Sequence, residues 1–151
     1  MPQSLAAIYC HIVFSTKGRE PWIGPGLEER LFAYIGGIVG ERKSVLLAAG
    51  GMPDHVHLLV SMGGTKAVCD LVRDIKCVSS GWIHETFPDD LGHFDWQDGN
   101  GAFSVSASGL ADVKAYLANQ KTRHAEQSFQ DEYRALLRKH EIAFDERYVW
   151  D

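Results

Sequence analysis

The sequence of 151 residues predicts an α+β fold, in which helices cover one face of an antiparallel sheet. Three observations support this expectation. Short runs alternate between apolar and polar residues, which is the period of a half-buried strand. Longer runs repeat apolar residues every three or four positions, which is the period of an amphipathic helix. The two kinds of run follow one another in the order β-α-β-β-α-β, with two more helices after them.

The runs also give approximate bounds for each element. The expected order is a strand over 5–15, a helix over 27–41, a strand over 44–49, a turn and strand over 52–61, a helix over 65–84, a long connection over 85–101, a strand over 102–106, a helix over 109–126 and a last helix from 128. A short glycine-rich connection before the third strand favours an antiparallel pair. This order matches the ferredoxin-like split βαβ pattern, which places helices on one face and leaves the other face open.

Composition sets limits on domain number and compartment. A chain of this length is expected to form a single domain, residues 1–151. Apolar residues make up 45% and charged residues 23%, as in ordinary globular proteins. No apolar run approaches the roughly 20 residues of a membrane span, and the start does not resemble a signal peptide. Three cysteines without metal-type spacing indicate reduced thiols, so we expect a cytoplasmic protein without membrane contact.

A pair of histidines is the first candidate for chemistry. His55 and His57 lie two residues apart in the third expected strand, so both point to the same face, about 7 Å apart along the strand. Two imidazoles at this spacing can lean together and share a cation. The alternative is a pair of half-exposed strand histidines without a function. A third ligand from elsewhere in the chain would favour the metal site.

The expected helix over 109–126 offers further candidates. Tyr116, Gln120 and His124 follow one another at intervals of four, so they line one edge of its apolar stripe. Tyr116 and Gln120 would lie one turn apart, about 6 Å along the axis. Taken alone, Tyr116 could be a core residue and Gln120 a solvated one.

Together these segments resemble a known family. Met52-Pro-Asp-His-Val-His-Leu-Leu-Val60 carries the histidine pair typical of HUH endonucleases. Followed by Tyr116-Leu-Ala-Asn-Gln120, it is similar to the single-tyrosine transposases of bacterial insertion sequences, including REP-associated tyrosine transposases. The segments 11–17 and 102–106 share the likeness, which covers nearly the whole chain. The histidine pair combined with Tyr-x-x-x-Gln makes the resemblance specific.

The resemblance implies a function and a set of site residues. Tyr116 would be the nucleophile, forming a 5′-phosphotyrosine, while His55, His57 and Gln120 would bind a divalent metal, Mg²⁺ or Mn²⁺. The substrate would be single-stranded DNA with a hairpin. The protein would act as a homodimer, with the tyrosine of one subunit completing the histidine site of the other. Family members often carry two adjacent histidines where this chain has Arg123-His124, so the role of His124 stays open, as does that of His11.

Net charge bears on how DNA would bind. The formal charge of −5 argues against a general positive field for duplex DNA, although a local basic groove remains compatible with it. The candidates for that groove are Lys17, Arg19, Arg73, Lys76, Lys121 and Arg123. For each of them a solvated surface role is the alternative.

The sequence is also compatible with two other functions. One is a nickase of the replication-initiator type with the same histidine pair, which the short length and the lack of a helicase-like segment disfavour. The other is a DNA-binding protein, non-catalytic or domesticated, that keeps the fold. The presence of His55, His57, Tyr116 and Gln120 favours the catalytic interpretation.

Overall fold

Four strands form one antiparallel sheet in the computed structural model, which describes residues 2–151. They are β1 (Tyr9–Ser15), β2 (Val45–Met52), β3 (His55–Ser61) and β4 (Gly101–Val105). Their spatial order is β2-β3-β1-β4, and every neighbouring pair is antiparallel. Because β3 lies between β1 and β2, the sheet has the ferredoxin-like split βαβ arrangement that the sequence predicts.

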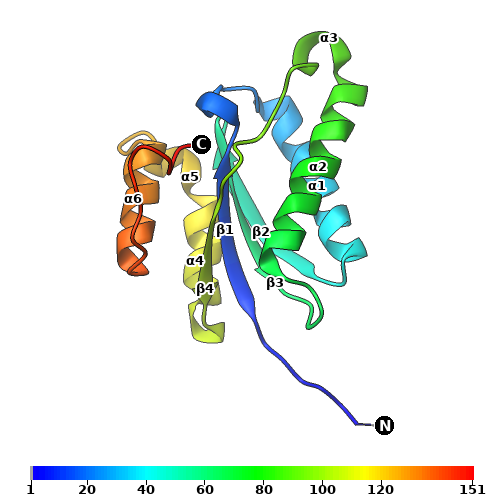
Figure 1. The fold of residues 1–151 in the computed structure, drawn as a ribbon, viewed down its shortest axis with the longest axis vertical. Coiled ribbons are helices and arrows are strands. Elements are labelled where there is room, and N and C mark those ends of the chain that lie inside the picture. Colours follow the sequence, from blue (N-terminus) through cyan, green and yellow to red (C-terminus); the bar gives the residue numbers. More distant parts are fainter. Residues whose placement is uncertain (1) are drawn as a thin grey trace.

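Two long helices cover one face of this sheet (Figure 1). They are α1 (Pro25–Glu41) and α2 (Val68–Thr86), followed by the short helix α3 (Pro88–Leu91). Their apolar stripes pack on the side chains of the central strands, and this main core includes Ile12, Phe14, Leu31, Ile35, Leu58, Leu71 and Ile75. Within residues 2–151, no helix is both long and apolar enough to cross a membrane.

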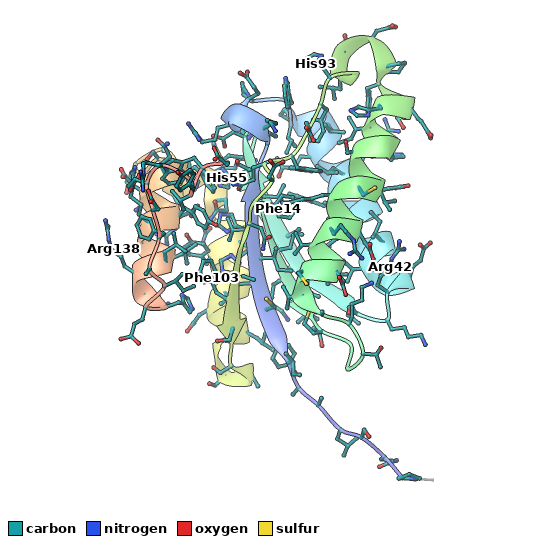
Figure 2. All side chains as sticks on the ribbon, viewed as in Figure 1. Phe14, Arg42, His55, His93, Phe103 and Arg138 are labelled. Atoms are coloured by element: carbon teal, nitrogen blue, oxygen red, sulfur yellow. The ribbon has the colours of Figure 1, made fainter. Side chains whose placement is uncertain are left out.

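The opposite face of the sheet is covered as well, which corrects the expectation of an open face. The covering helices are α4 (Leu110–Ala118), α5 (Gln120–Arg123) and α6 (Phe129–Lys139), on the other side of the sheet from α1 and α2 (Figure 1). A second, smaller core forms there from Val13, Phe103, Phe129, Tyr133 and Leu137. Figure 2 shows Phe14 and Phe103, which belong to the first and the second core respectively.

Several element bounds differ from the expected ones for identifiable reasons. The single helix expected over 109–126 is interrupted at Asn119, whose backbone (φ −99°, ψ 15°) leaves helical geometry. Asparagine competes with helical hydrogen bonds through its own side chain. A 3₁₀ turn, η2 (Ala107–Gly109), precedes α4. Strand β1 begins only at Tyr9, because both of its partner strands end opposite that residue.

Two glycines allow the C-terminal helices to lie close to the sheet. A Cβ atom on Gly50 of β2 would lie 2.0 Å from the backbone oxygen of Leu117 in α4. A Cβ atom on Gly101 of β4 would lie 2.7 Å from the ring of Tyr133 in α6. No side chain fits at either distance, so these positions need glycine for steric reasons.

The Gly50 contact leads to a stability prediction. Gly50→Ala should destabilise the protein by about 1–3 kcal/mol, because the new methyl group forces α4 away from β2. Chemical denaturation followed by tryptophan fluorescence measures the change. Gly37→Ala is the control, since a Cβ there meets nothing within 4 Å and α1 should gain up to about 1 kcal/mol. Unchanged stability of Gly50→Ala would contradict the close packing.

Candidate active site

The histidine pair is completely buried under the C-terminal helices. Alternation along β3 directs His55 and His57 to the same face, and their ring centroids are 5.1 Å apart. Both side chains are 0% exposed. The ring of Phe129 from α6 stacks on His55 at 4.3 Å. Histidines in this position are therefore not half-exposed strand residues but part of an enclosed polar cluster.

A carboxylate fixes the orientation of His55. The Nδ1–H of His55 donates to Oδ1 of Asp54 at 2.7 Å, since a carboxylate can only accept. Burial raises the pKa of Asp54, but the hydrogen bond and the electrostatic interaction with His55 together outweigh it, so the pKa lies below its usual value. With Nδ1 used on Asp54, His55 directs its Nε2 to the interior of the cluster. This is the carboxylate–histidine arrangement common behind metal ligands.

His11 plays a similar part for His57. The Nε2 atom of His11 lies 2.8 Å from Nδ1 of His57, and the two rings stack. Burial lowers the pKa of both histidines, and the neighbouring His57 helps to bring that of His11 to about 3. Both rings are therefore neutral near pH 7. Because Nε2–H of His57 donates to Glu132, Nδ1 of His57 accepts from Nε2–H of His11. A tautomer change of both rings would let His11 accept from Nδ1–H of His57 and would free Nε2 of His57 for a metal.

Tyr116 and Gln120 reach the histidines despite the break between their helices. Gln120 is 1% exposed, and its Oε1 lies 3.2 Å from Nε2 of His55. The Tyr116 ring lies 5.7 Å from the ring of His57. The structure therefore brings together the four residues that the sequence singles out. The guanidinium of Arg123 lies over the Tyr116 ring, 4.4 Å from its centre.

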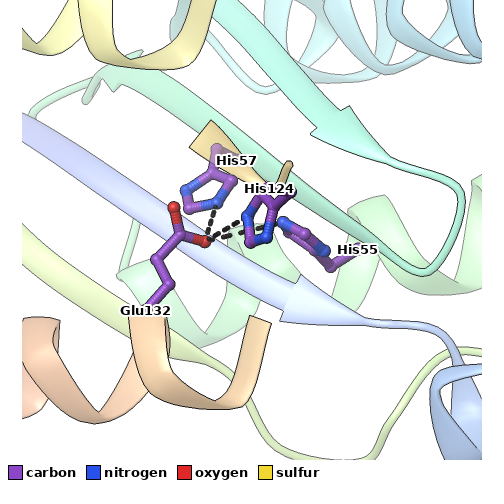
Figure 3. Close-up of side chains that lie close together, drawn as sticks. All are labelled: His55, His57, His124 and Glu132. Carbon is purple, nitrogen blue, oxygen red and sulfur yellow. Dashed lines mark hydrogen bonds and ion pairs between the residues drawn. The ribbon is translucent and has the colours of Figure 1, made fainter. Parts of the chain in front are cut away.

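One residue at the centre of this cluster, Glu132 of α6, is not among the candidates that the sequence patterns indicate. It is 2% exposed, and its Oε1 lies 2.9 Å from Nε2 of His57 and 3.0 Å from Nε2 of His124 (Figure 3). Its Oε2 accepts hydrogen bonds from Gln120 Nε2, at 2.9 Å, and from the Tyr116 hydroxyl. The sequence signal was an acidic residue on the apolar stripe of the last helix.

The pKa values of this cluster reflect its burial and its hydrogen bonds. Burial alone would raise the pKa of Glu132, yet hydrogen bonds from His57, Tyr116 and Gln120 hold it well below its usual range. Burial and the contact with Glu132 raise the pKa of the Tyr116 hydroxyl well above its ordinary value of about 10. Glu132 is therefore an anion in the resting chain, and Tyr116 is a neutral phenol that donates to it.

The cluster has the composition of a metal site. His55, His57, His124 and Glu132 each offer one ligand atom, and these atoms all lie within 4.8 Å of one another. The Oε1 atom of Gln120 lies 3.2 Å from Nε2 of His55, so an amide oxygen is also within reach of this position. Imidazole and carboxylate ligands suit Mn²⁺ and similar ions better than Mg²⁺, which prefers oxygen alone. The residues present thus fit a divalent cation.

The six candidate DNA-binding residues are spread over the molecule, and only Arg123 lies at the cluster. Lys121 donates to Glu28 at 2.6 Å and to the backbone oxygen of Gly51 at 2.7 Å. The guanidinium of Arg19, in the 3₁₀ turn η1 (Lys17–Arg19), lies 5.8 Å from the ring centre of Trp150. In the same turn, the Lys17 ammonium lies 3.7 Å from a carboxylate oxygen of Asp98.

The remaining two candidates belong to α2, on the other side of the sheet. Arg73 pairs with two aspartates of its own helix, Asp70 and Asp74. The Lys76 ammonium donates to the backbone oxygens of residues 97, 98 and 99. Burial lowers the pKa of Lys76 to about 8. All three of its donors are used to fix the connection before β4, so Lys76 has a structural role whether or not it also contacts DNA.

Comparison with known proteins assigns the family. The family model for IS200-like transposases matches residues 4–120, which is most of the chain. The chain belongs to this family, and its class is therefore that of the transposases, enzymes that cleave DNA and transfer strands. No curated protein matches the chain. His124 and Glu132 lie beyond the matched residues.

Solved structures share the fold. A protein of Deinococcus radiodurans R1, assigned as a transposase, aligns with a TM-score of 0.65 and 23% identity, over 80% of this chain and 95% of its own. A REP-associated tyrosine transposase, solved bound to a REP hairpin, aligns with a TM-score of 0.60 and 13% identity, over 82% of this chain and 72% of its own.

The role of Asp54 can be tested through metal affinity. Asp54→Ala should weaken Mn²⁺ binding by about 10- to 100-fold, because His55 loses the partner that holds its ring and tautomer. Isothermal titration calorimetry with MnCl₂ measures this directly. Asp98→Ala, at an exposed aspartate outside the cluster, is the control. Equal Mn²⁺ affinity for Asp54→Ala and the wild type would show that Asp54 does not orient a metal ligand.

Proposed function

We propose that this transposase cleaves and rejoins single-stranded DNA through a covalent bond to Tyr116. The observation that carries the proposal is the convergence of Tyr116, Gln120 and the His55–His57 pair in one buried cluster, although they are up to 65 residues apart. A phenol beside two imidazoles and an amide oxygen has the parts needed for phosphoryl transfer. These are a nucleophile and groups that can hold a cation against the phosphate.

Cleavage would exchange one phosphorus–oxygen bond for another. The Tyr116 oxygen attacks phosphorus, and its bond to phosphorus forms as the bond between phosphorus and the 3′-oxygen breaks. The phenol gives up its proton to water, and the 3′-oxygen takes up a proton from water to become a hydroxyl, so no net proton is gained or lost. The 5′-phosphotyrosine keeps the energy of the phosphodiester, so a 3′-hydroxyl can attack it later and join strands without ATP.

His55, His57 and Gln120 would hold the divalent cation, with His124 and Glu132 within reach of the same position. When bound there, the cation would withdraw charge from the scissile phosphate and orient it for in-line attack. Asp54 and His11 hold the two imidazole rings in place through their Nδ1 atoms, with both Nε2 atoms turned inward. Glu132 orients the Tyr116 hydroxyl by accepting a hydrogen bond from it. The nitrogen-rich set favours Mn²⁺, although Mg²⁺ serves the same role in principle.

We propose hairpin-bearing single-stranded DNA as the substrate, on the chromosome in the bacterial cytoplasm. The structurally similar REP-associated transposase bound to a REP hairpin supports this choice. The charge of −5 means that contact must come from a local patch rather than from an overall field. Arg123 beside Tyr116 is the best-placed cation for the strand at the site, and Lys17 and Arg19 are exposed enough to contact a hairpin stem.

A gel assay tests the covalent step. Wild-type protein mixed with labelled single strands from the flanks of its own gene and Mn²⁺ should give an adduct that survives denaturation, and a chelator should prevent it. Tyr116→Phe should abolish the adduct and leave DNA binding within about twofold, because only the attacking oxygen is lost. Tyr148→Phe, at an exposed tyrosine, is the control. Binding without any adduct would instead support a non-catalytic DNA-binding protein.

We further propose a homodimer whose sites are completed in trans. In a single chain α4 lies on its own β2 and β3, through the contact at Gly50. In the dimer, α4 would take the same place on the sheet of its partner, with the segments 106–109 and 124–128 following a different path.

Mixing two inactive variants tests this arrangement. His57→Ala retains the tyrosine and Tyr116→Phe retains the histidine pair, so each alone should form no adduct. If sites are completed in trans, the mixture should recover part of the adduct formation, since mixed dimers contain one intact site. No recovery, with dimers present in size-exclusion chromatography, would show that each chain completes its own site as it does in a single chain.

A further inference from the structure

A cavity of about 380 Å³ lies between β4, α4 and α6, on the far side of Tyr116 from Gln120. Its volume falls within the range of small-molecule binding sites. Its walls combine aromatic, apolar and polar side chains, among them His11, Phe103, Val113, Tyr116, Lys139 and His140. The reaction proposed above places no group in this cavity.

The cavity shares two walls with the candidate active site. Tyr116 is both the proposed nucleophile and a lining residue. His11, the hydrogen-bonding partner of His57, lines the cavity as well, and its ring centroid lies 6.0 Å from those of Tyr116 and Phe103. A phosphate bound beside Tyr116 and His57 would therefore lie within about one nucleotide of the mouth of the cavity.

The lining suits a planar, polar-edged ligand. Phe103 is buried and packs its ring on that of His140, tilted by 32° with their centres 4.7 Å apart, so the partly exposed His140 is the ring in this pair against which a base can stack. His140 uses Nδ1 on the backbone oxygen of Leu136, which leaves Nε2 for another partner. The exposed carboxylate of Asp112 and ammonium of Lys139 add an acceptor and donors for the edge of a base. Bases of a single strand enter such pockets with little loss of stacking.

We propose that this cavity binds one nucleobase of the cleaved strand, next to the phosphate that Tyr116 attacks. The inference rests on the proposed function and adds to it a protein contact that helps to choose the cleavage position. Removing that base should slow adduct formation by about 5- to 150-fold, the usual contribution of a base stacked on aromatic side chains.

Two measurements test the proposal. First, abasic sites are placed one at a time on either side of the cleaved phosphate in a strand that forms the adduct. One position should show the expected loss. Second, 5-iodouracil at that position is cross-linked to Tyr116→Phe, which keeps the strand uncleaved. Mass spectrometry should find the link at Phe103 or His140. No sensitive position, or links only to residues outside the cavity, would overturn the proposal.

A pair of tryptophan substitutions adds a matched control. Val113→Trp fills the cavity from α4, and Lys114→Trp places the same ring on an exposed position of the same helix. The effect of the abasic site should disappear in Val113→Trp and persist in Lys114→Trp. Persistence in both would count against the cavity. If unmodified strands give no adduct with the wild type, the proposed function itself fails, and the nucleobase site fails with it.

Discussion

The hydrogen bonds of one buried carboxylate, that of Glu132, determine how the C-terminal part of the chain meets the sheet. An anion without partners in an apolar interior is strongly unfavourable, so a buried glutamate needs donors from every side. Here the donors come from β3, α4, α5 and the turn that follows α5, through His57, Tyr116, Gln120 and His124. These contacts favour a single position for α6, in which the histidines are enclosed.

The two faces of the sheet carry different kinds of side chain, apolar on one and partly polar on the other. Its central strands are buried on both faces, with Ile12, Phe14 and Leu58 packed against α1 and α2 in a mainly apolar core. The other face carries the polar residues, and every one of them is held by a neighbour, as His55 is by Asp54. A site built on central strands is rigid because the main core fixes the backbone beneath it. The price of burying so many polar groups is that they must be satisfied together, and within residues 2–151 no buried side-chain nitrogen or oxygen lacks a partner.

Much of the fold follows from local patterns that act within one element. Alternation in β3 is enough to place His55 beside His57, and the stripe of Leu31 and Ile35 is enough to place α1 on the sheet. The order of elements then selects the split βαβ topology. A shift of one residue in the pairing of β3 would expose its apolar side chains. The sequence therefore also predicts which face of β3 carries His55 and His57.

The parts that the sequence could not predict depend on contacts between distant segments. Glu132 meets His57 across 75 residues, and its only local sign is a charge on an apolar helix face. The covering of the second face depends on the missing side chain of Gly50, which a pattern of hydrophobicity does not reveal. Lysines look alike in a sequence, yet Lys76 is bound to three backbone oxygens and Lys121 to a glutamate. Such pairings appear only once the elements are packed.

The most direct test of the central claim is to locate the covalent bond. The denatured complex with single-stranded DNA would be digested with nuclease and trypsin, and the modified peptide sequenced by mass spectrometry. The account predicts a nucleotide linked through its 5′-phosphate to Tyr116, the one tyrosine whose hydroxyl lies beside both the histidine pair and Glu132 among the described residues. A nucleotide attached to any other residue would contradict the assignment of the nucleophile and the reading of the buried cluster as the active site.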